Sequence, residues 1–209
     1  MGAGAGSYEP RELRVVAVEP SLTMIRQRER DAAPAVRAHA SDLPFRDASF
    51  DAALALLTLH HWPDLQRGVA ELARAARRRV VIFTHDPAAD GFWLEDYFPA
   101  LFRIGRRILP SLADLRRALG RSAVFDVPVP RDCRDGFQGA YWCRPEAYLD
   151  AGVCSAISSF AQLDAAELAG GLARLCADLA SGEWEGRHGA LRAREEIDLG
   201  YRLLVAESA

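Results

Sequence analysis

Glycines and one acidic residue near the start of the chain have the types and spacing of a ligand site. Gly2, Gly4 and Gly6 alternate with alanine, and Glu19 ends the next apolar run. Such a loop lets the backbone approach a ligand where a Cβ atom would clash. When a helix follows, its N–H groups can face an anionic or polar ligand end. A carboxylate at the place of Glu19 can accept hydrogen bonds from both hydroxyls of a ribose. A disordered glycine-rich tail and a surface carboxylate are the alternative interpretations.

Histidines also follow apolar runs. His60 and His61 come after one run and His85 ends another, at the strand ends where sites form in α/β sheets. An imidazole there could take a proton from an O–H or N–H group. Packing or hydrogen bonding is the alternative role for each. Adjacent side chains of an extended segment point apart, so we expect no metal site built from these histidines and Asp86.

The elements that position these residues are predicted from apolar runs. The runs that are apolar on both faces favour a parallel sheet covered by helices, as in α/β folds. We predict six strands, at residues 14–19, 35–40, 50–57, 79–84, 124–129 and 201–206. Pro128 indicates the edge or end of the fifth strand.

Four helices are predicted from periodicity and capping residues. They cover residues 65–76, with Pro63 in the first turn; 112–119, between Ser111 and Gly120; a short helix from Pro145; and a helix behind Asp164 and Glu167, which resemble a capping box.

The composition fits one globular domain. The chain has 209 residues, half of them hydrophobic, and a formal net charge of −3. This charge gives no reason to expect a nucleic-acid partner. No apolar run approaches the ~20 residues of a membrane span, and no signal peptide is recognised, so we expect a cytoplasmic protein without a membrane partner. Cys133, Cys143, Cys154 and Cys176 match no zinc pattern, and we expect packed, reduced thiols.

Five motifs in order resemble the class I S-adenosylmethionine (SAM)-dependent methyltransferases, a superfamily that includes the ubiquinone/menaquinone-biosynthesis methyltransferases. The stretch from Leu43 to Asp51 is similar to LPF-x-D-x-SFD of that family. The others are the glycine run, Val18–Met24, the LHH at Leu59–His61, and the E-x-x-R of Glu71 and Arg74. The resemblance is good over residues 2–86. It implies a Rossmann-like sheet flanked by helices, with a helical insertion before the last strands. Residues 1–209 would form a single domain, with a cofactor-binding half at 1–86 and a substrate-side half at 87–209.

The resemblance also implies roles for individual residues toward SAM. The glycines would lie under the methionine portion, and Glu19 would bind the ribose. The predicted strand at residues 50–57 corresponds to the fourth strand of the family, and its end would face the sulfonium. Flanking the adenine would be Pro20, Ser21 and Met24, with Ala40 and Ser41 at its edge. Facing the sulfonium would be Leu57, Thr58 and His61, while His60 and His85 are further candidate bases. His39 departs from the family, which usually has an acidic residue there.

A second departure concerns the strand that family members carry before the glycines, ending in D-x-G-x-G. Met1 occupies the x position, so the fold as written lacks its first, central strand. Without that strand two neighbours would lose a partner. We expect that the true start lies upstream. The rival hypothesis is a truncated, inactive paralogue.

The function expected is therefore SAM-dependent methyl transfer to a small-molecule acceptor. One alternative is a non-catalytic methyltransferase-like protein. A weaker one is a nicotinamide-dependent oxidoreductase, disfavoured by Ser7, by the LPF stretch and by a short first helix broken at Pro10. The aromatic residues of 92–98 and of a second group, Phe137, Tyr141, Trp142 and Tyr148, could line an acceptor pocket or form core. Arg103, Arg106 and Arg107 could receive an acidic substrate or form a solvated face.

Overall fold

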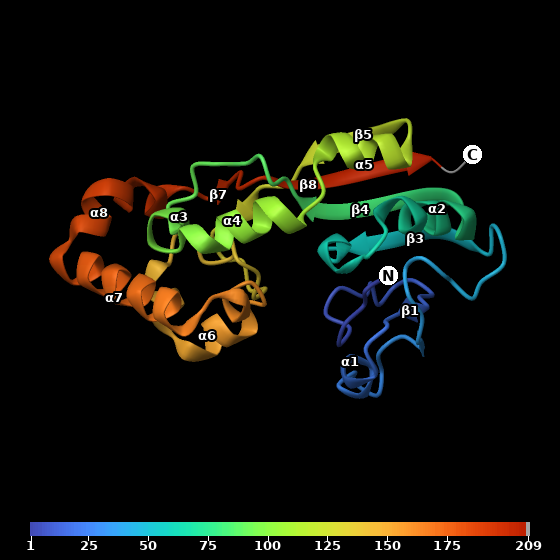
Figure 1. The fold of residues 1–209 in the computed structure, drawn as a ribbon, viewed down its shortest axis with the longest axis horizontal. Coiled ribbons are helices and arrows are strands. Elements are labelled where there is room, and N and C mark those ends of the chain that lie inside the picture. The colour runs from blue at the N-terminus through green and yellow to red at the C-terminus, as the bar shows by residue number, and fades with distance from the viewer. Residues whose placement is uncertain (208–209) are drawn as a thin grey trace. The chain divides into compact units, whose positions relative to one another are not determined.

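The computed structural model describes residues 1–207, which form two compact units (Figure 1). The first unit contains residues 1–86, 109–125 and the chain from residue 202 onward. The second contains residues 87–108 and 126–201. The assignment of 1–209 to a single domain stays a prediction.

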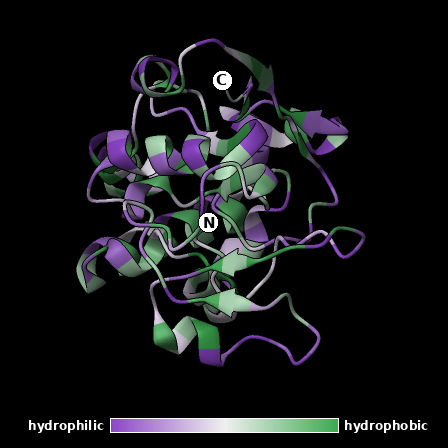
Figure 2. Ribbon diagram, turned by 90° about the vertical axis from the view of Figure 1, so that its right-hand side faces the viewer, coloured by the Kyte–Doolittle hydropathy of each residue, from purple (hydrophilic) through white to green (hydrophobic). Residues whose placement is uncertain are grey.

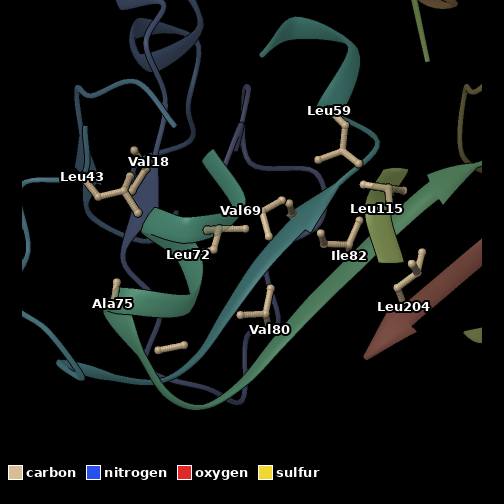
Figure 3. Packing of buried hydrophobic residues seen from close by; sticks show 12 residues of the cluster. Val18, Leu43, Leu59, Val69, Leu72, Ala75, Val80, Ile82, Leu115 and Leu204 are labelled. Atoms are coloured by element: carbon tan, nitrogen blue, oxygen red, sulfur yellow. The ribbon is translucent and has the colours of Figure 1, made fainter. Parts of the chain in front are cut away.

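The first unit is built on a four-stranded sheet whose strand order is β3-β4-β8-β5. The strands are β3 (Phe50–Leu56), β4 (Ala76–His85), β8 (Tyr201–Glu207) and β5 (Ser122–Asp126). β3 and β4 are parallel, from Ala52 opposite Arg79 to Leu56 opposite Phe83, whereas β8 runs opposite to β4 in Figures 1 and 3. β1 (Ala17–Val18) and β2 (Ala35–Val36) form a separate parallel pair. The expected α/β architecture is confirmed.

The three α-helices of the first unit begin at side chains that satisfy free backbone N–H groups, whereas its 3₁₀ turn has no side-chain cap. They are α1 (Leu22–Arg26), α2 (Leu65–Ala75), α5 (Leu112–Leu119) and the 3₁₀ turn η1 (Leu59–His61). Ser111 accepts from the Asp114 N–H and Gly120 ends α5 at φ 73°, as predicted. The placement of Pro63 in the first turn of α2 was wrong, because Asp64 is the N-cap and accepts from the Arg67 N–H.

The core of the first unit lies between the sheet and α2 (Figure 3). Val69 and Leu72 of α2 face Val80 and Ile82 of β4, and all four are at most 2% exposed. Val18, Leu43, Leu59, Leu115 and Leu204 extend this cluster from other elements. In Figure 2 the helices are banded purple and green, the pattern of amphipathic helices with one buried face.

Residues 1–3 lie between β1 and β3. The nitrogen of Met1 donates to the Leu54 carbonyl at 2.7 Å, and the Ala3 N–H donates to the Val18 carbonyl at 3.1 Å. β1 and β3 each have one strand neighbour among the described residues. This break in the sheet is where the sequence analysis expected a further strand. The hypothesis of an upstream start stays a prediction.

Several predicted elements are corrected by the structure. The strands at 14–19 and 35–40 shrink to two residues each, since each pairs along one edge only, and residues 39–42 form a turn. The run at 124–129 divides at Val127 and Pro128 into β5 and β6 (Val129–Pro130). Residues 4–13 form turns and no helix, because Pro10 cannot supply a helical N–H donor. The described residues contain eight strands, two more than predicted.

The second unit is mainly helical. Its elements are α3 (Leu94–Tyr97), α4 (Pro99–Ile108), η2 (Pro145–Leu149), α6 (Ala151–Ala156), η3 (Phe160–Gln162), α7 (Ala165–Ser181), α8 (Glu183–His188), η4 (Gly189–Ala193) and a short antiparallel pair, β6 with β7 (Glu196–Ile197). Asp164 caps α7 by accepting from the Glu167 N–H at 2.7 Å, as its position predicted. The short helix expected at Pro145 is η2.

Aromatic side chains form the core of the second unit. The Trp93 ring contacts those of Tyr148 and Trp184 edge-on, with centroids 5.6 and 5.3 Å apart. Its indole N–H donates to the Trp142 carbonyl at 2.7 Å. Trp142, Tyr148 and Trp184 are 0% exposed, so these aromatic residues form core and do not line an open pocket.

The arginine and cysteine side chains of this unit were expected to have structural roles. Arg103 and Arg106 pair with Glu167 and Glu95, so part of the arginine group lies on a solvated face. The four cysteines form no disulfide, but Cys176 is exposed on α7, so not all of them are packed. No helix within residues 1–207 is long and apolar enough to cross a bilayer.

Candidate cofactor site

The glycine loop adopts a backbone that only glycine takes up readily. The φ angles of Gly2, Gly4 and Gly6 are 65°, 52° and 103°, in the left-handed region. A Cβ atom at Gly2 would lie 2.0 Å from Oγ1 of Thr58. The loop and the end of β3 therefore approach each other as closely as atoms allow. Gly2 and Thr58 were both predicted site residues, and the structure brings them together.

Glu19 lies at the carboxyl end of β1 with its side chain turned toward the loop. Its Oε2 accepts from the Gly4 N–H and its Oε1 from the Ser21 N–H, both at 2.9 Å. Glu19 is 7% exposed. An ionised carboxylate has about four acceptor sites, so two remain after these bonds. The carboxylate is thus held in place by backbone and retains capacity for a ligand's hydroxyls.

α1 begins directly after Glu19 and packs its first turn under the loop. Ser21 Oγ accepts from the Met24 N–H at 3.3 Å, which caps the helix. A Cβ atom at Gly4 would lie 3.6 Å from Cε of Met24. Pro20 is held by its carbonyl, which accepts from Arg37 Nε at 3.2 Å. The segment predicted to flank an adenine therefore lies beside the glycine loop.

The end of β3 carries a strained backbone. Leu57 has φ 49°, which costs a non-glycine residue on the order of 1–3 kcal/mol and persists only where the surroundings impose it. Its N–H donates to the Phe83 carbonyl of β4 at 2.8 Å. The reversal turns the chain into η1 and places Thr58, 6% exposed, against Gly2. Such outliers concentrate at functional sites.

The two histidines of η1 correct the expectation that their side chains point apart. They lie in a 3₁₀ turn, and their ring centroids are 3.9 Å apart. Burial, and then the neighbouring His61, lower the pKa of His60 to about 4. His60 is therefore neutral near pH 7, while His61 is exposed at the same corner. Among residues 1–207 no His, Cys, Asp and Glu side chains gather as a metal site.

The remaining predicted site residues, His85, Ala40 and Ser41, lie on other segments. His85 ends β4, two residues beyond the Phe83 that pairs with Leu56, and so shares the carboxyl edge of the parallel pair with Leu57. Ala40 and Ser41 occupy the turn closed by the Asp42 N–H and the His39 carbonyl at 3.1 Å. Ala40 is buried.

Glu71 and Arg74 hold the loop that precedes β3. Glu71 Oε2 accepts from the Leu43 N–H at 2.8 Å, and Arg74 donates to the carbonyls of Leu43 and Phe45. The hydrogen bond from Arg74 lowers the pKa of Glu71. Asp47 accepts from Arg74 at 2.8 Å. The E-x-x-R and LPF-x-D motifs therefore form one structural unit that clamps the loop to α2.

One pair of site residues was missed by the sequence analysis. Glu9 and Arg28 form an ion pair beneath the glycine loop, with side chains 14% and 5% exposed. The residues are 19 positions apart, on a turn and beyond a short helix. Neither periodicity nor a local motif connects such residues, so no signal in the sequence marks them as a pair.

A glycine loop, an acidic residue at the next strand end and a parallel pair with a strained end are the features of a nucleotide-binding protein of the α/β class. Comparison with known proteins specifies the family. The family model described as "Methyltransferase domain" matches residues 1–84. A crystal structure of a putative methyltransferase from an antibiotic biosynthesis pathway of Anabaena variabilis is 35% identical, with a TM-score of 0.93, and the match covers 99% of this chain and 88% of that one.

Curated relatives match shorter parts. An uncharacterised protein of Mycobacterium bovis is 29% identical over 136 residues, 53% of this chain and 47% of that protein. The 2-methyl-6-phytyl-1,4-hydroquinone methyltransferase 2 of rice is 34% identical over 65 residues, 31% of this chain and 19% of that protein. The chain spans about half the length of the first of these relatives. This chain belongs to the class I SAM-dependent methyltransferase superfamily. That membership disfavours the nicotinamide-dependent oxidoreductase considered as an alternative from the sequence.

Proposed function

We propose that this chain binds SAM at the glycine loop and transfers its methyl group to a small-molecule acceptor. The observation that carries the proposal is the arrangement around Gly4. The Gly4 N–H donates to Glu19. Gly2, two residues earlier, lies so close to Thr58 that a Cβ atom on Gly2 would not fit. The loop, the acidic strand end and the strained strand end thus meet around one backbone segment.

The residues present fit SAM. The glycine backbone provides a surface free of side chains for the methionine portion. Glu19 has two acceptor sites left for the ribose hydroxyls, and Pro20, Ser21 and Met24 offer a mixed surface for the adenine. Ala40 and Ser41 would contact the adenine edge through their backbone. When bound, SAM supplies a methyl group on a positively charged sulfur, already activated for displacement.

The chain's own contribution is then mainly alignment, which can be worth roughly 7–11 kcal/mol. Leu57 and Thr58 would fix the sulfonium end at the tip of β3. As the methyl group bonds to the acceptor, the S–C electron pair stays on sulfur, and an O–H or N–H acceptor loses its proton. A base with pKa about 4 is a poor proton acceptor near neutrality, so His60 is the weaker candidate. We assign proton removal to His61, exposed at the same corner, with His85 as the second candidate.

Two relatives support a small organic acceptor. The Anabaena protein is described as a putative methyltransferase from an antibiotic biosynthesis pathway. The rice protein is named for a hydroquinone that carries a phytyl chain. An acceptor with an apolar part and a nucleophilic hydroxyl or amine is consistent with both.

A methyl-transfer assay tests the proposal. The chain is incubated with methyl-labelled SAM and sets of phenols, hydroquinones and amines, and labelled product is extracted. We expect label in at least one set, with at least ~100-fold less in Glu19→Ala and no change in Glu12→Ala, whose carboxylate is exposed. A folded chain that binds no S-adenosylhomocysteine (SAH) and labels no acceptor would contradict the proposal and support the non-catalytic alternative.

A further inference from the structure

The segment that follows the glycine loop is held by side chains and not by helical structure. Residues 4–13 form turns and bends without helix, and local backbone bonds run from the Gly6 N–H to the Ala3 carbonyl and from the Leu13 N–H to the Pro10 carbonyl. Helical N–H groups that could fix a ligand's polar end are therefore not formed there. Another device must hold the loop in its left-handed conformation.

The Glu9–Arg28 pair provides such a device. Arg28 Nη2 donates to Glu9 Oε1 and, at 2.8 Å, to the Ala33 carbonyl. Glu9 Oε2 accepts from the Ala33 N–H at 3.0 Å. The ion pair thus ties the turn after the glycines to the segment that leads into β2. Arg28 Nη1 also donates to the Gly4 carbonyl at 3.3 Å, which ties both to the loop itself.

Gly4 is consequently fixed from both sides of its backbone. Its N–H is bound by Glu19 and its carbonyl by Arg28. Gly6 lies over the ion pair, since a Cβ atom there would come within 3.4 Å of Arg28 and 3.6 Å of Glu9. Any ligand that rests on the loop between Gly4 and Gly6 meets a surface whose shape depends on these two charged side chains.

Because the Glu9–Arg28 pair is buried, loss of either partner should change the conformation of the glycine loop. Only 5% of the Arg28 side chain and 14% of the Glu9 side chain are exposed, so each charge depends on the other for compensation. Breaking a buried pair by removing one partner leaves an uncompensated charge. The surrounding turns would then have to open, and the glycine loop would move with them.

We propose that Arg28, fixed by Glu9, is a positioning residue of the cofactor loop and sets the affinity for the amino-acid half of SAM. The inference rests on the proposed function for the identity of the ligand. It goes beyond that function by assigning the loop's shape to an ion pair that touches the glycine loop at Gly4 and Gly6.

The test compares Arg28→Met, Arg28→Lys and Glu9→Gln with two matched controls, Arg26→Met on the exposed face of α1 and Glu12→Gln on the exposed turn. Three quantities are measured on the full chain: SAH affinity by calorimetry, the thermal midpoint, and amide hydrogen exchange of residues 2–8 without ligand. A purely structural role would change the midpoint alone.

We expect Arg28→Met to raise the SAH dissociation constant by about 10-fold or more, because the Gly4 carbonyl loses its donor and the loop then has to be ordered at the cost of binding. Exchange of residues 2–8 should accelerate in parallel. Arg28→Lys should be intermediate, since one ammonium cannot reproduce the guanidinium fork. Glu9→Gln should act in the same direction, and both controls should match the unmodified chain.

Unchanged exchange in Arg28→Lys and Glu9→Gln, with SAH affinity within twofold of the unmodified chain, would overturn the proposal even if Arg28→Met failed to fold. If the unmodified chain does not bind SAH, the proposed function fails by itself. Hydrogen exchange then still decides whether the pair holds the loop: faster exchange supports this, and unchanged exchange overturns it.

Discussion

Two regions were candidate sites in the sequence: the glycine loop with the nearby strand ends, and the aromatic cluster of the second unit. They are stabilised by different interactions. Around the loop, polar side chains are bound by backbone groups: Glu19 accepts two N–H groups, and Arg28 reaches the Gly4 carbonyl. In the aromatic cluster, rings meet edge-on and Trp93, Trp142 and Tyr148 are almost fully buried.

The difference shows which sequence signals point to a ligand. Backbone strain and the burial of charged groups cost free energy, so they persist where something depends on them. Edge-to-face aromatic contacts themselves stabilise the fold by about 0.5–1.5 kcal/mol per pair beyond burial. The loop should therefore affect cofactor affinity, and the cluster should affect stability. Four predictions test this division, from the largest effect to the smallest.

Replacement of Trp142 by alanine should affect stability most. The side chain is 0% exposed, and removal of a buried tryptophan costs about 3–5 kcal/mol. Denaturant unfolding measures the loss. SAH affinity, measured where the variant is still folded, should stay unchanged. A variant of normal stability with weakened SAH binding would invert the comparison.

Gly2→Ala should affect affinity most. The added Cβ would lie 2.0 Å from Thr58 Oγ1, in a residue with φ 65°, and either the loop or the end of β3 must move. We expect SAH affinity to fall by at least about 100-fold, or about 2.7 kcal/mol, in a titration. Gly91→Ala is the matched control, because Gly91 also has positive φ (78°) but open space around it. Equal losses of affinity in both variants would show that backbone strain alone explains the result.

Glu71→Ala should destabilise the loop that the E-x-x-R motif clamps. It removes the acceptor of the buried Leu43 N–H and the partner of Arg74, a loss of about 1–3 kcal/mol. Because Arg74 lowers the pKa of Glu71, the contribution is present above the carboxyl's ordinary pKa and disappears as the pH falls through the lowered value. Denaturant unfolding at pH 7 and at pH 3 measures it. Asp51→Ala, which removes only a surface pair with Arg77, should leave stability unchanged.

His60 should contribute the smallest effect, a slope in stability against pH. Burial lowers its pKa from 6.5 to about 4. Between these values the unfolded chain binds more protons than the folded chain, so unfolding becomes easier as the pH falls. His60→Gln should lessen the slope in this window, while the exposed His39→Gln should retain it. Identical unfolding curves from pH 4 to 6.5 for His60→Gln and the unmodified chain would contradict the assigned burial.

Much of the fold could be predicted because the signals are local. β3 and β4 each contain an apolar run, the caps at Ser111, Gly120 and Asp164 fix helix ends, and the motif order located Glu19. The predicted ends of strands were wrong where a neighbouring strand determines them. The first two predicted strands shortened because strand length follows hydrogen bonds to a neighbour, which the sequence of one strand does not contain.

The candidate site was predictable in its residue types and less so in its geometry. Gly2, Gly4, Glu19, Met24 and Thr58 do meet, since the glycine loop lies between the end of β1 and the end of β3. The contact between the His60 and His61 rings was missed because the strained Leu57 converts an expected extended segment into a 3₁₀ turn. The Glu9–Arg28 pair was missed because charges on separate turns are paired by tertiary structure alone.

The central claim is that the glycine loop and Glu19 form a cofactor site, and titration calorimetry with SAH tests it most directly. The account predicts saturable binding to one site in the unmodified chain. In Glu19→Gln, which keeps the shape of the side chain but loses its charge, affinity should fall by at least about 10-fold, while Glu12→Gln should bind normally. A folded chain that gives no binding heat at any temperature and no shift of its thermal midpoint with SAH, or a Glu19→Gln variant that binds SAH equally well, would contradict it.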